Sequence, residues 1–179
     1  MKKVLSVVLA VMMLASLSIF AFADVNPSVA TKAAPEVESV AVAGISGATA
    51  EAVSVADAED EAVKKDIEDA IAAVSTEEGL TDALAAAEVV LPEGAKAAVS
   101  DVFYFDVKDA NGESVFKADG SVKAKVKLEL PDNLLCVLQF VDGEWIEVEF
   151  VPDGNGGFAL NICHAGPIVF VYNSNVEKG

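Results

Sequence analysis

The feature that most constrains the fold is a run of strictly alternating residues between Gly120 and Pro131. Successive side chains of a strand point to opposite faces, so this alternation predicts a strand with one buried and one solvated face. Asp119-Gly120 favours a turn before the strand, and Pro131 ends it. The expected inward side chains are Val122, Ala124, Val126, Leu128 and Leu130, and the outward ones are Lys123, Lys125, Lys127 and Glu129.

The same pattern extends over the second half of the chain. Short apolar segments recur roughly every ten residues, separated by turn residues such as Asn111-Gly112. Asp142-Gly143 is the strongest hairpin signal among them. The pattern predicts an antiparallel Ig-like β-sandwich over residues 89–179 rather than a parallel α/β sheet. The expected strands lie at 89–91, 99–108, 122–130, 134–141, 144–151, 157–163 and 167–173, with Ile146, Val148 and Phe150 pointing inward.

Two short helices are expected before the strands, over residues 57–88. The first, at 57–74, has apolar residues at helical spacing and acidic residues in its first turn, where the helix dipole favours negative charge. Ser75 stands three residues before Glu78, a capping-box spacing that predicts the start of the second helix. The expected fold class is therefore mainly β, α+β overall, with a two-helix segment followed by the sandwich.

Residues 24–56 are rich in Ala, Val, Ser and Glu, with few large apolar residues and no persistent helical stripe. This composition predicts a flexible linker. Within it, Val37, Val40, Val42 and Ile45 are candidates for one short strand.

Residues 1–23 have the pattern of a secretory signal peptide. Lys2 and Lys3 precede an apolar run that ends in an A-x-A cleavage site at 21–23. We therefore expect a mature protein that begins at Asp24, is secreted or lies at the extracellular cell surface, and has no membrane contact after cleavage. A retained anchor is the alternative, because the apolar run is nearly long enough to span a bilayer.

The charge of the chain excludes several classes of partner. The sequence holds 29 acidic residues against 12 lysines and no arginine, a net charge of −17. Such a charge discourages contact with nucleic acid or anionic lipid. Arginine, the preferred residue for bidentate phosphate binding, is missing. We expect no nucleic-acid partner and no phosphoryl-transfer chemistry.

Cys136 and Cys163 are the two cysteines of the chain. Secretion permits a disulfide between them, but alternation places Cys136 inward and Cys163 outward, so a disulfide and two inert thiols both stay open. Thiol catalysis is not expected. The one histidine, His164, directly follows Cys163, and on a strand their side chains would point to opposite faces.

Other candidate sites have ordinary structural explanations. The oxygen-rich segments 109–113 and 153–156 lack the spacing of a calcium-binding loop and are typical of turns. The glutamates at 144–149 are expected to form a solvated strand face rather than the carboxylate pair of a glycosidase. The lysines of the alternating strand are interpreted as protection of a sheet edge. We expect no metal, no cofactor and no catalytic residue.

Trp145 and Tyr104 are the candidate ligand-binding residues. Alternation places Trp145 on the same face as Glu147 and Glu149, which is the expected solvent side, and Tyr104 is outward by the same argument. Exposed aromatic rings can stack on sugars. If the two helices pack over that face, Trp145 is instead buried beneath them.

Several segments together carry a family resemblance. They are 102–107, the run that ends in Leu130-Pro131, 137–145 and 165–171. In these segments the chain resembles the Ig-like β-sandwich modules of secreted and cell-surface proteins of Gram-positive, mostly anaerobic, gut bacteria. Such modules often follow a short helical segment, and the resemblance implies a stalk, spacer or binding role.

The sequence thus favours a secreted, non-enzymatic protein whose module serves in adhesion, spacing or protein interaction. Its partner would be an extracellular protein or a cell-surface glycan. The alternative is a carbohydrate-binding module that uses Trp145 and Tyr104, and the solvent exposure of the two rings separates these hypotheses.

Overall fold

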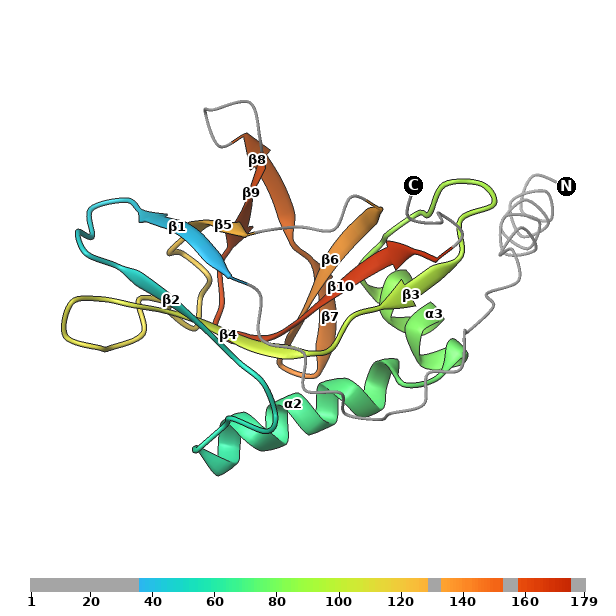
Figure 1. Ribbon diagram of the computed structural model, residues 1–179, viewed down its shortest axis with the longest axis horizontal. Helices are drawn as coiled ribbons and strands as arrows, with labels where there is room; N and C mark the ends of the chain where they lie inside the picture. The colour runs from blue at the N-terminus through green and yellow to red at the C-terminus, as the bar shows by residue number, and fades with distance from the viewer. Residues whose placement is uncertain (1–35, 129–132, 153–157, 175–179) are drawn as a thin grey trace, which may run out of the picture.

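The structure is a computed structural model that describes residues 36–128, 133–152 and 158–174. The expected signal peptide and the first part of the expected linker lie outside the described residues. Within them, two antiparallel sheets and two helices make up the molecule, so the predicted mainly β, α+β class is confirmed (Figure 1). No helix in the described part of the chain is both long and apolar enough to cross a membrane.

The smaller sheet, sheet A, has the strand order β1-β5-β9-β8. The larger sheet, sheet B, has the order β2-β4-β10-β6-β7, and β3 also pairs with β10. The strands of sheet A are β1 (Val37–Val42), β5 (Ala124–Leu128), β9 (Phe158–Ile162) and β8 (Glu149–Pro152). Those of sheet B are β2 (Thr49–Val53), β4 (Phe103–Lys108), β10 (Gly166–Asn173), β6 (Leu134–Val141), β7 (Glu144–Glu147) and β3 (Ala97–Val99).

A first apolar core fills the space between the two sheets. Phe103, Phe105 and Val107 of β4 point into it while the residues between them are less buried, as the alternation predicts. Sheet A contributes inward residues of β5 and β9, including Val126 and Leu160, which are fully buried. The predicted inward face of the 122–130 strand is therefore confirmed for the described residues of β5.

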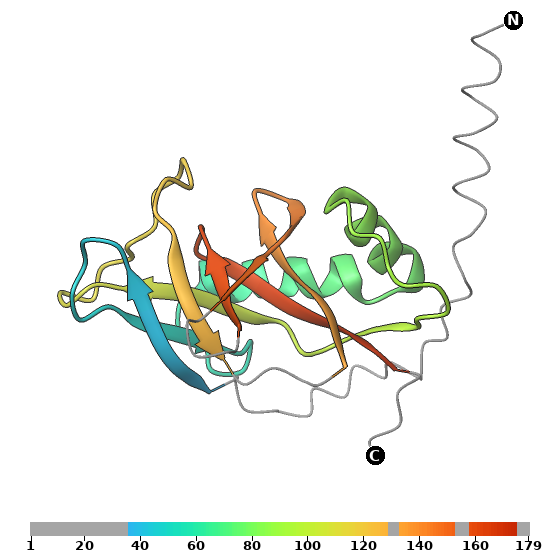
Figure 2. The same ribbon diagram turned by 90° about the horizontal axis from the view of Figure 1, so that it is seen from above.

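A second core lies on the other face of sheet B, beneath the helices α2 (Glu61–Val74) and α3 (Glu77–Ala86) (Figure 2). Helix α2 contacts β4 and β10, and α3 contacts β7. Both faces of sheet B are thus covered, one by sheet A and one by the helices. The buried members of this second core are Ile67, Ala70, Val74, Leu80, Ala83, Leu84, Ala97, Val102, Cys136, Leu138, Trp145, Val169 and Val171.

Side-chain caps determine the residues at which the two helices begin. The Asp60 carboxylate accepts the backbone N–H groups of Ala62 and Val63, so α2 begins four residues later than the prediction of 57. The second helix is capped by Thr76, whose hydroxyl accepts the N–H of Gly79, and not by Ser75. The Ser75 hydroxyl instead donates to the carbonyl of Ala72 at the end of α2, so the predicted cap is wrong by one residue.

The predicted linker is wrong for the described residues from 36 onward. β1 pairs with β5 and β2 pairs with β4, so both sheets recruit strands that precede the helices. Val42 is buried, and Ala50 and Ala52 pack against the first core. Small side chains are enough to pack these strands against the core because each strand covers only one face.

The short strand predicted at 89–91 is also wrong, since the structure has no strand at these positions.

The chain passes from sheet B to sheet A at Val148, between β7 and β8. The Val148 N–H donates to the carbonyl of Val137, and Val148 is buried in the first core. The predicted single strand over 144–151 is therefore two strands in different sheets. Ile146, predicted to be inward, is 38% exposed because it lies on β7 at the edge of sheet B.

Candidate functional groove

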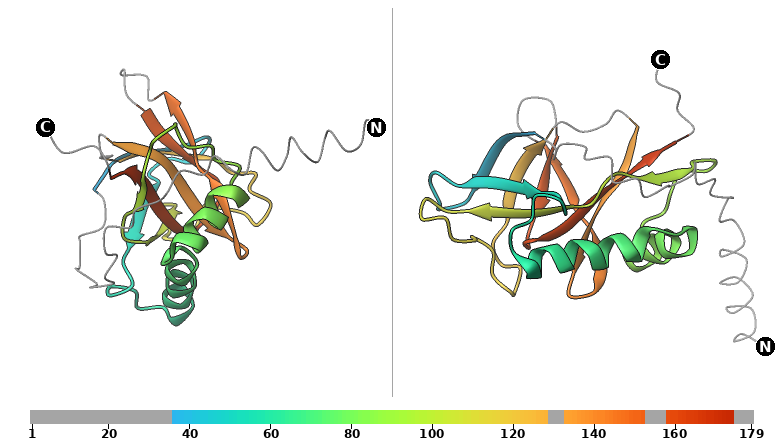
Figure 3. Two further views of the ribbon diagram at one scale, coloured as in Figure 1. Left: turned by 90° about the vertical axis from the view of Figure 1, so that its right-hand side faces the viewer. Right: turned by 60° about the horizontal axis from the view of Figure 1, so that its bottom comes forward.

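A groove of about 640 Å³ lies where α2 passes the tip of the β6–β7 hairpin. Four segments line it: Asp66 and Asp69 of α2, the loop at 114–118, the hairpin tip at 140–143, and residues 164–167 at the start of β10. In the right view of Figure 3 the tip of the orange β6–β7 hairpin extends past α2. We call this site the α2–hairpin groove.

The hairpin tip is held by the turn that the sequence predicts. Asp142 and Gly143 have φ values of 52° and 87°, the left-handed pair of a tight two-residue hairpin turn. Pairing of Val141 with Glu144 closes the turn. The turn places Asp142 on the lining of the groove, where it is exposed.

The loop at 114–118 is anchored at its start. Asp109 accepts the N–H groups of Asn111 and Glu113, which turns the chain back, and these bonds lower the pKa of its carboxyl group. The N–H of Val115 then donates to the carbonyl of Val107, and Val115 enters the first core. Phe116, the next residue, lines the groove while packing against that core.

The floor of the groove is the start of β10. Pro167 lies directly opposite Tyr104 of β4, and the half-buried Tyr104 belongs to the helix side of sheet B. Below the floor, the buried Gln139 side chain donates to the backbone carbonyl of His164 at 2.8 Å. This bond ties β6 to the segment that lines the groove.

His164 lines the groove and packs closely on the backbone at Gly120. A Cβ atom at Gly120 would lie 2.8 Å from the His164 Nε2 atom, and Gly120 has φ of +63°. The left-handed backbone conformation favours glycine at this position, and a larger residue would also displace the imidazole.

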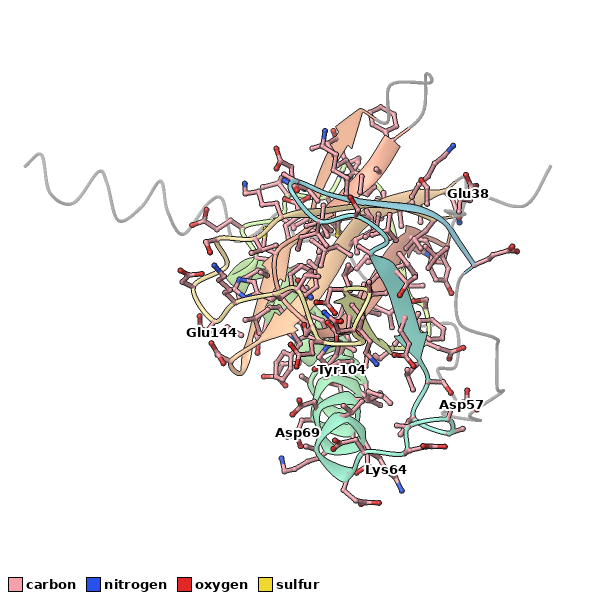
Figure 4. All side chains as sticks on the ribbon, turned by 90° about the vertical axis from the view of Figure 1, so that its left-hand side faces the viewer. Glu38, Asp57, Lys64, Asp69, Tyr104 and Glu144 are labelled. Carbon is pink, nitrogen blue, oxygen red and sulfur yellow. The ribbon has the colours of Figure 1, made fainter. Side chains whose placement is uncertain are left out.

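Carboxylates dominate the electrostatics of the groove. Asp66, Asp69 and Asp142 line it, against the single ammonium of Lys117. Asp69 is also ion-paired with Lys65 one turn earlier on the exposed face of α2. In the view of Figure 4, Tyr104 lies above Asp69 of α2, and Glu144 of the hairpin lies to the left of both.

The acidic surroundings extend to Tyr104. Burial raises the pKa of its phenol, and the negative charges of Asp106, Asp66 and Asp60 raise it further. The neutral phenol is therefore favoured, and the negative potential at this end of sheet B comes from α2 as well as β4.

Of the two alternatives left open for Trp145, the structure has burial beneath the helices and not exposure. Its ring is only 4% exposed, lies in the core beneath the helices, and has no hydrogen-bond partner for Nε1 among the described residues. The predicted shared face of Trp145 and Glu147 is consistent with the pairing of β7 with β6, but α2 and α3 cover that face. Tyr104 is half-buried, so the two rings do not form an exposed aromatic platform.

The two cysteines are unpaired in the structure. Cys136 is buried on the helix side of sheet B, and Cys163 follows β9 of sheet A. Desolvation raises the pKa of the Cys136 thiol to about 12, with a smaller contribution from Glu147, so it remains protonated at neutral pH. Of the two open alternatives, the structure has the free thiols.

The lysines of the alternating strand do not protect an edge. β5 lies between β1 and β9, in the interior of sheet A, so that interpretation is wrong. Lys123 and Lys125 are exposed, and Lys127 forms an ion pair with Glu38 at 3.0 Å. These side chains form a basic row outside the α2–hairpin groove.

Among the described residues, no group of three or more His, Cys, Asp or Glu side chains could hold a metal ion. The loop at 109–113, considered as a calcium site, uses Asp109 for the turn hydrogen bonds described above. The second oxygen-rich segment, at 153–156, lies outside the described residues.

Sequence reasoning did not identify the groove. Asp66, Asp69, Phe116 and Phe140 carry no sequence motif that singles them out as site residues. The one local signal was Asp142-Gly143, which predicted the hairpin but not the helix that lies beside it.

No family model, curated protein or solved structure matches the chain.

Proposed function

We propose that this protein is a secreted, non-enzymatic interaction module that binds an extracellular partner in the α2–hairpin groove. The observation that carries the proposal is the groove itself, whose 640 Å³ is within the usual range for ligand sites, roughly 300–1,000 Å³. Its walls come from a capped helix and a tight hairpin. Rigid elements of this kind present a surface at little entropic cost.

Hydrogen bonds in and near the groove support a binding role over a catalytic one. Ser114 and His164 both line the groove, but the Ser114 hydroxyl donates to Asp106 at 2.6 Å and not to the imidazole. The Cys163 thiol is directed to the carbonyl of Asn161, at 3.9 Å. Nucleophilic catalysis needs a nucleophile bonded to its base, and neither side chain has this arrangement.

We further propose that the two sheets are a variant of the Ig-like sandwich. Support comes from their antiparallel pairing around one core and from the Asp142-Gly143 hairpin. In this proposal β1 and β2 are strands of the module that precede the helices in sequence, and α2 and α3 cover its larger sheet.

A carbohydrate-binding role is less well supported. It relied on exposed Trp145 and Tyr104, and burial of Trp145 leaves Tyr104 as the single ring of the pair with exposed surface. A sugar platform would then need the groove aromatics Phe116 and Phe140.

Location is tested by fractionating cells that express the full chain and sequencing the N-terminus of the product. We expect mature protein that starts at Asp24, in the medium or on the outer surface. Intact Met1 in the membrane fraction would show that the signal segment is retained as an anchor.

A bulky substitution on the lining of the groove tests its role in binding. Ala118 is exposed and lines the groove, so Ala118→Trp adds bulk there without changing charge. Ala86→Trp, at an exposed position on α3 outside the groove, is the matched control. We expect saturable binding of labelled mature protein to the surface of producing cells, lost in Ala118→Trp and retained in Ala86→Trp. Equal binding by both variants would refute a role for the groove.

A further inference from the structure

Two segments of the chain contribute carboxylates to the lining of the α2–hairpin groove. Asp66 and Asp69 belong to α2, and Asp142 belongs to the hairpin tip. The two segments are more than 70 positions apart in sequence and are brought together by the packing of α2 on sheet B. A ligand in the groove therefore meets carboxylates from both the helix and the hairpin.

Apolar residues also line the groove. They include Phe116, Phe140 and Pro167, of which the two phenylalanines are only half-buried. Phe140 is also held by its contact with Trp145, the ring centroids being 5.0 Å apart. Aromatic faces next to carboxylates attract an ammonium or guanidinium group as well as the apolar chain that carries it.

The negative charge of the groove and of the whole chain favours a positively charged ligand. Lys117 is the one cation on the lining, and the whole chain has a net charge of −17. Long-range attraction therefore steers cations toward the molecule and repels anions, and the groove adds local contacts. An acidic or phosphorylated ligand would meet repulsion from the carboxylates of both the helix and the hairpin.

We propose that the α2–hairpin groove binds a basic, partly apolar peptide segment of the partner, in which lysine or arginine alternates with apolar residues. Lysine or arginine head groups contact Asp66 of α2 and Asp142 of the hairpin, and the apolar side chains lie on Phe116 and Phe140. This inference rests on the proposed binding role of the groove and names the chemistry of its ligand.

The test uses fluorescence anisotropy of a labelled, N-acetylated pentapeptide of alternating lysine and leucine, added to the mature chain. The double variant Asp66→Asn/Asp142→Asn removes one charge from the helix and one from the hairpin. Asp82→Asn/Glu93→Gln removes the same two charges from exposed positions outside the groove. Far-UV circular dichroism shows whether each variant is folded.

We expect the groove double variant to weaken peptide binding by about tenfold, since each exposed ion pair contributes modestly. The control should stay within about twofold, and binding should weaken as salt screens the charges. A peptide with glutamate in place of lysine should not bind.

Three results would overturn the inference. Equal weakening in both double variants would mean that net charge alone attracts the peptide. Spermidine competing as well as the peptide would mean that the apolar contacts contribute nothing. No binding of the basic peptide, when Ala118→Trp still abolishes attachment to producing cells, would refute the ligand class and leave the binding role of the groove intact. Cell attachment insensitive to Ala118→Trp would remove the proposed function as well.

Discussion

At the scale of single residues, Trp145 shows how covering a face changes the role of a side chain. An outward aromatic residue on an edge strand of a two-layer sandwich would be exposed. Here the helices cover that face, and Trp145 packs against Phe140 with the ring planes tilted by 48°. The ring stabilises the attachment of the helices to the sheet, and its buried N–H lowers the net gain.

Trp145 is the one tryptophan of the chain, so its fluorescence reports on this contact directly. We expect short-wavelength emission from the folded protein, little quenching by iodide, and a red shift on unfolding. Oligosaccharides should leave the spectrum unchanged. Iodide quenching of the folded protein as strong as that of the unfolded chain would contradict burial of the ring.

The buried thiol of Cys136 should make the folded protein less stable as the pH becomes alkaline. Its pKa is raised to about 12 in the folded state, whereas an unfolded thiol ionises near 9. Between these values the unfolded state binds fewer protons than the folded state, so the free energy of unfolding falls as pH rises. The loss is up to about 1.4 kcal/mol per pH unit.

Denaturant unfolding of the wild type and of Cys136→Ala, measured from pH 8 to pH 11, checks this expectation. The variant lacks this thiol but keeps the tyrosines and lysines that also titrate. We expect the stability of the wild type to fall more steeply than that of Cys136→Ala above pH 9. If the unfolding free energies of the two proteins fell in parallel with pH, the Cys136 thiol would not be shielded from solvent.

At the scale of elements, the turn between α2 and α3 constrains Gly79. A Cβ atom at this position would lie 2.2 Å from the carbonyl oxygen of Ala73, which is a backbone atom and cannot rotate away. Gly79 lies in the first turn of α3, and its N–H donates to the Thr76 hydroxyl that caps the helix. The glycine thus permits the close approach of the two helices.

Helix propensity alone favours alanine over glycine, by about 1 kcal/mol in a helix interior. We expect the opposite at this turn: Gly79→Ala should lower the free energy of unfolding by roughly 1–3 kcal/mol through the steric clash. Ala86→Gly, on the exposed face of the same helix, should cost no more than about 1 kcal/mol. Stabilisation by Gly79→Ala in urea denaturation would refute the close approach.

At the scale of the whole molecule, the strands that precede the helices are integral to both sheets. β1 and β2 complete sheets A and B, and the helices cover Trp145 and Cys136. A fragment of residues 89–179, the sandwich expected from sequence alone, would expose both the second core and two strand edges. Its apolar burial would not balance its conformational entropy.

We therefore expect the 89–179 fragment to lack a cooperative unfolding transition, while the mature chain from Asp24 unfolds cooperatively. Circular dichroism of both chains during urea denaturation provides the measurement. Cooperative unfolding of the fragment, with a native-like spectrum, would contradict the shared core.

Sequence periodicity predicted those features that depend on neighbouring residues. It identified the alternation of β4 and β5, the Asp142-Gly143 hairpin and the two amphipathic helices. It indicated β1 as a candidate short strand but missed β2, because an alanine and valine strand that covers one face resembles a linker in composition. It also missed the exposure of Ile146, because no local signal marks the passage between sheets at Val148. The groove depends on contacts between distant segments, which periodicity does not encode.

The central claim is that the α2–hairpin groove is the binding surface, and its most direct test is an NMR titration of the mature chain with the alternating lysine–leucine peptide. We expect amide shift changes concentrated at residues 66–69, 114–118, 140–143 and 164–167. Changes spread evenly over exposed acidic residues, or confined to other surfaces, would contradict the claim.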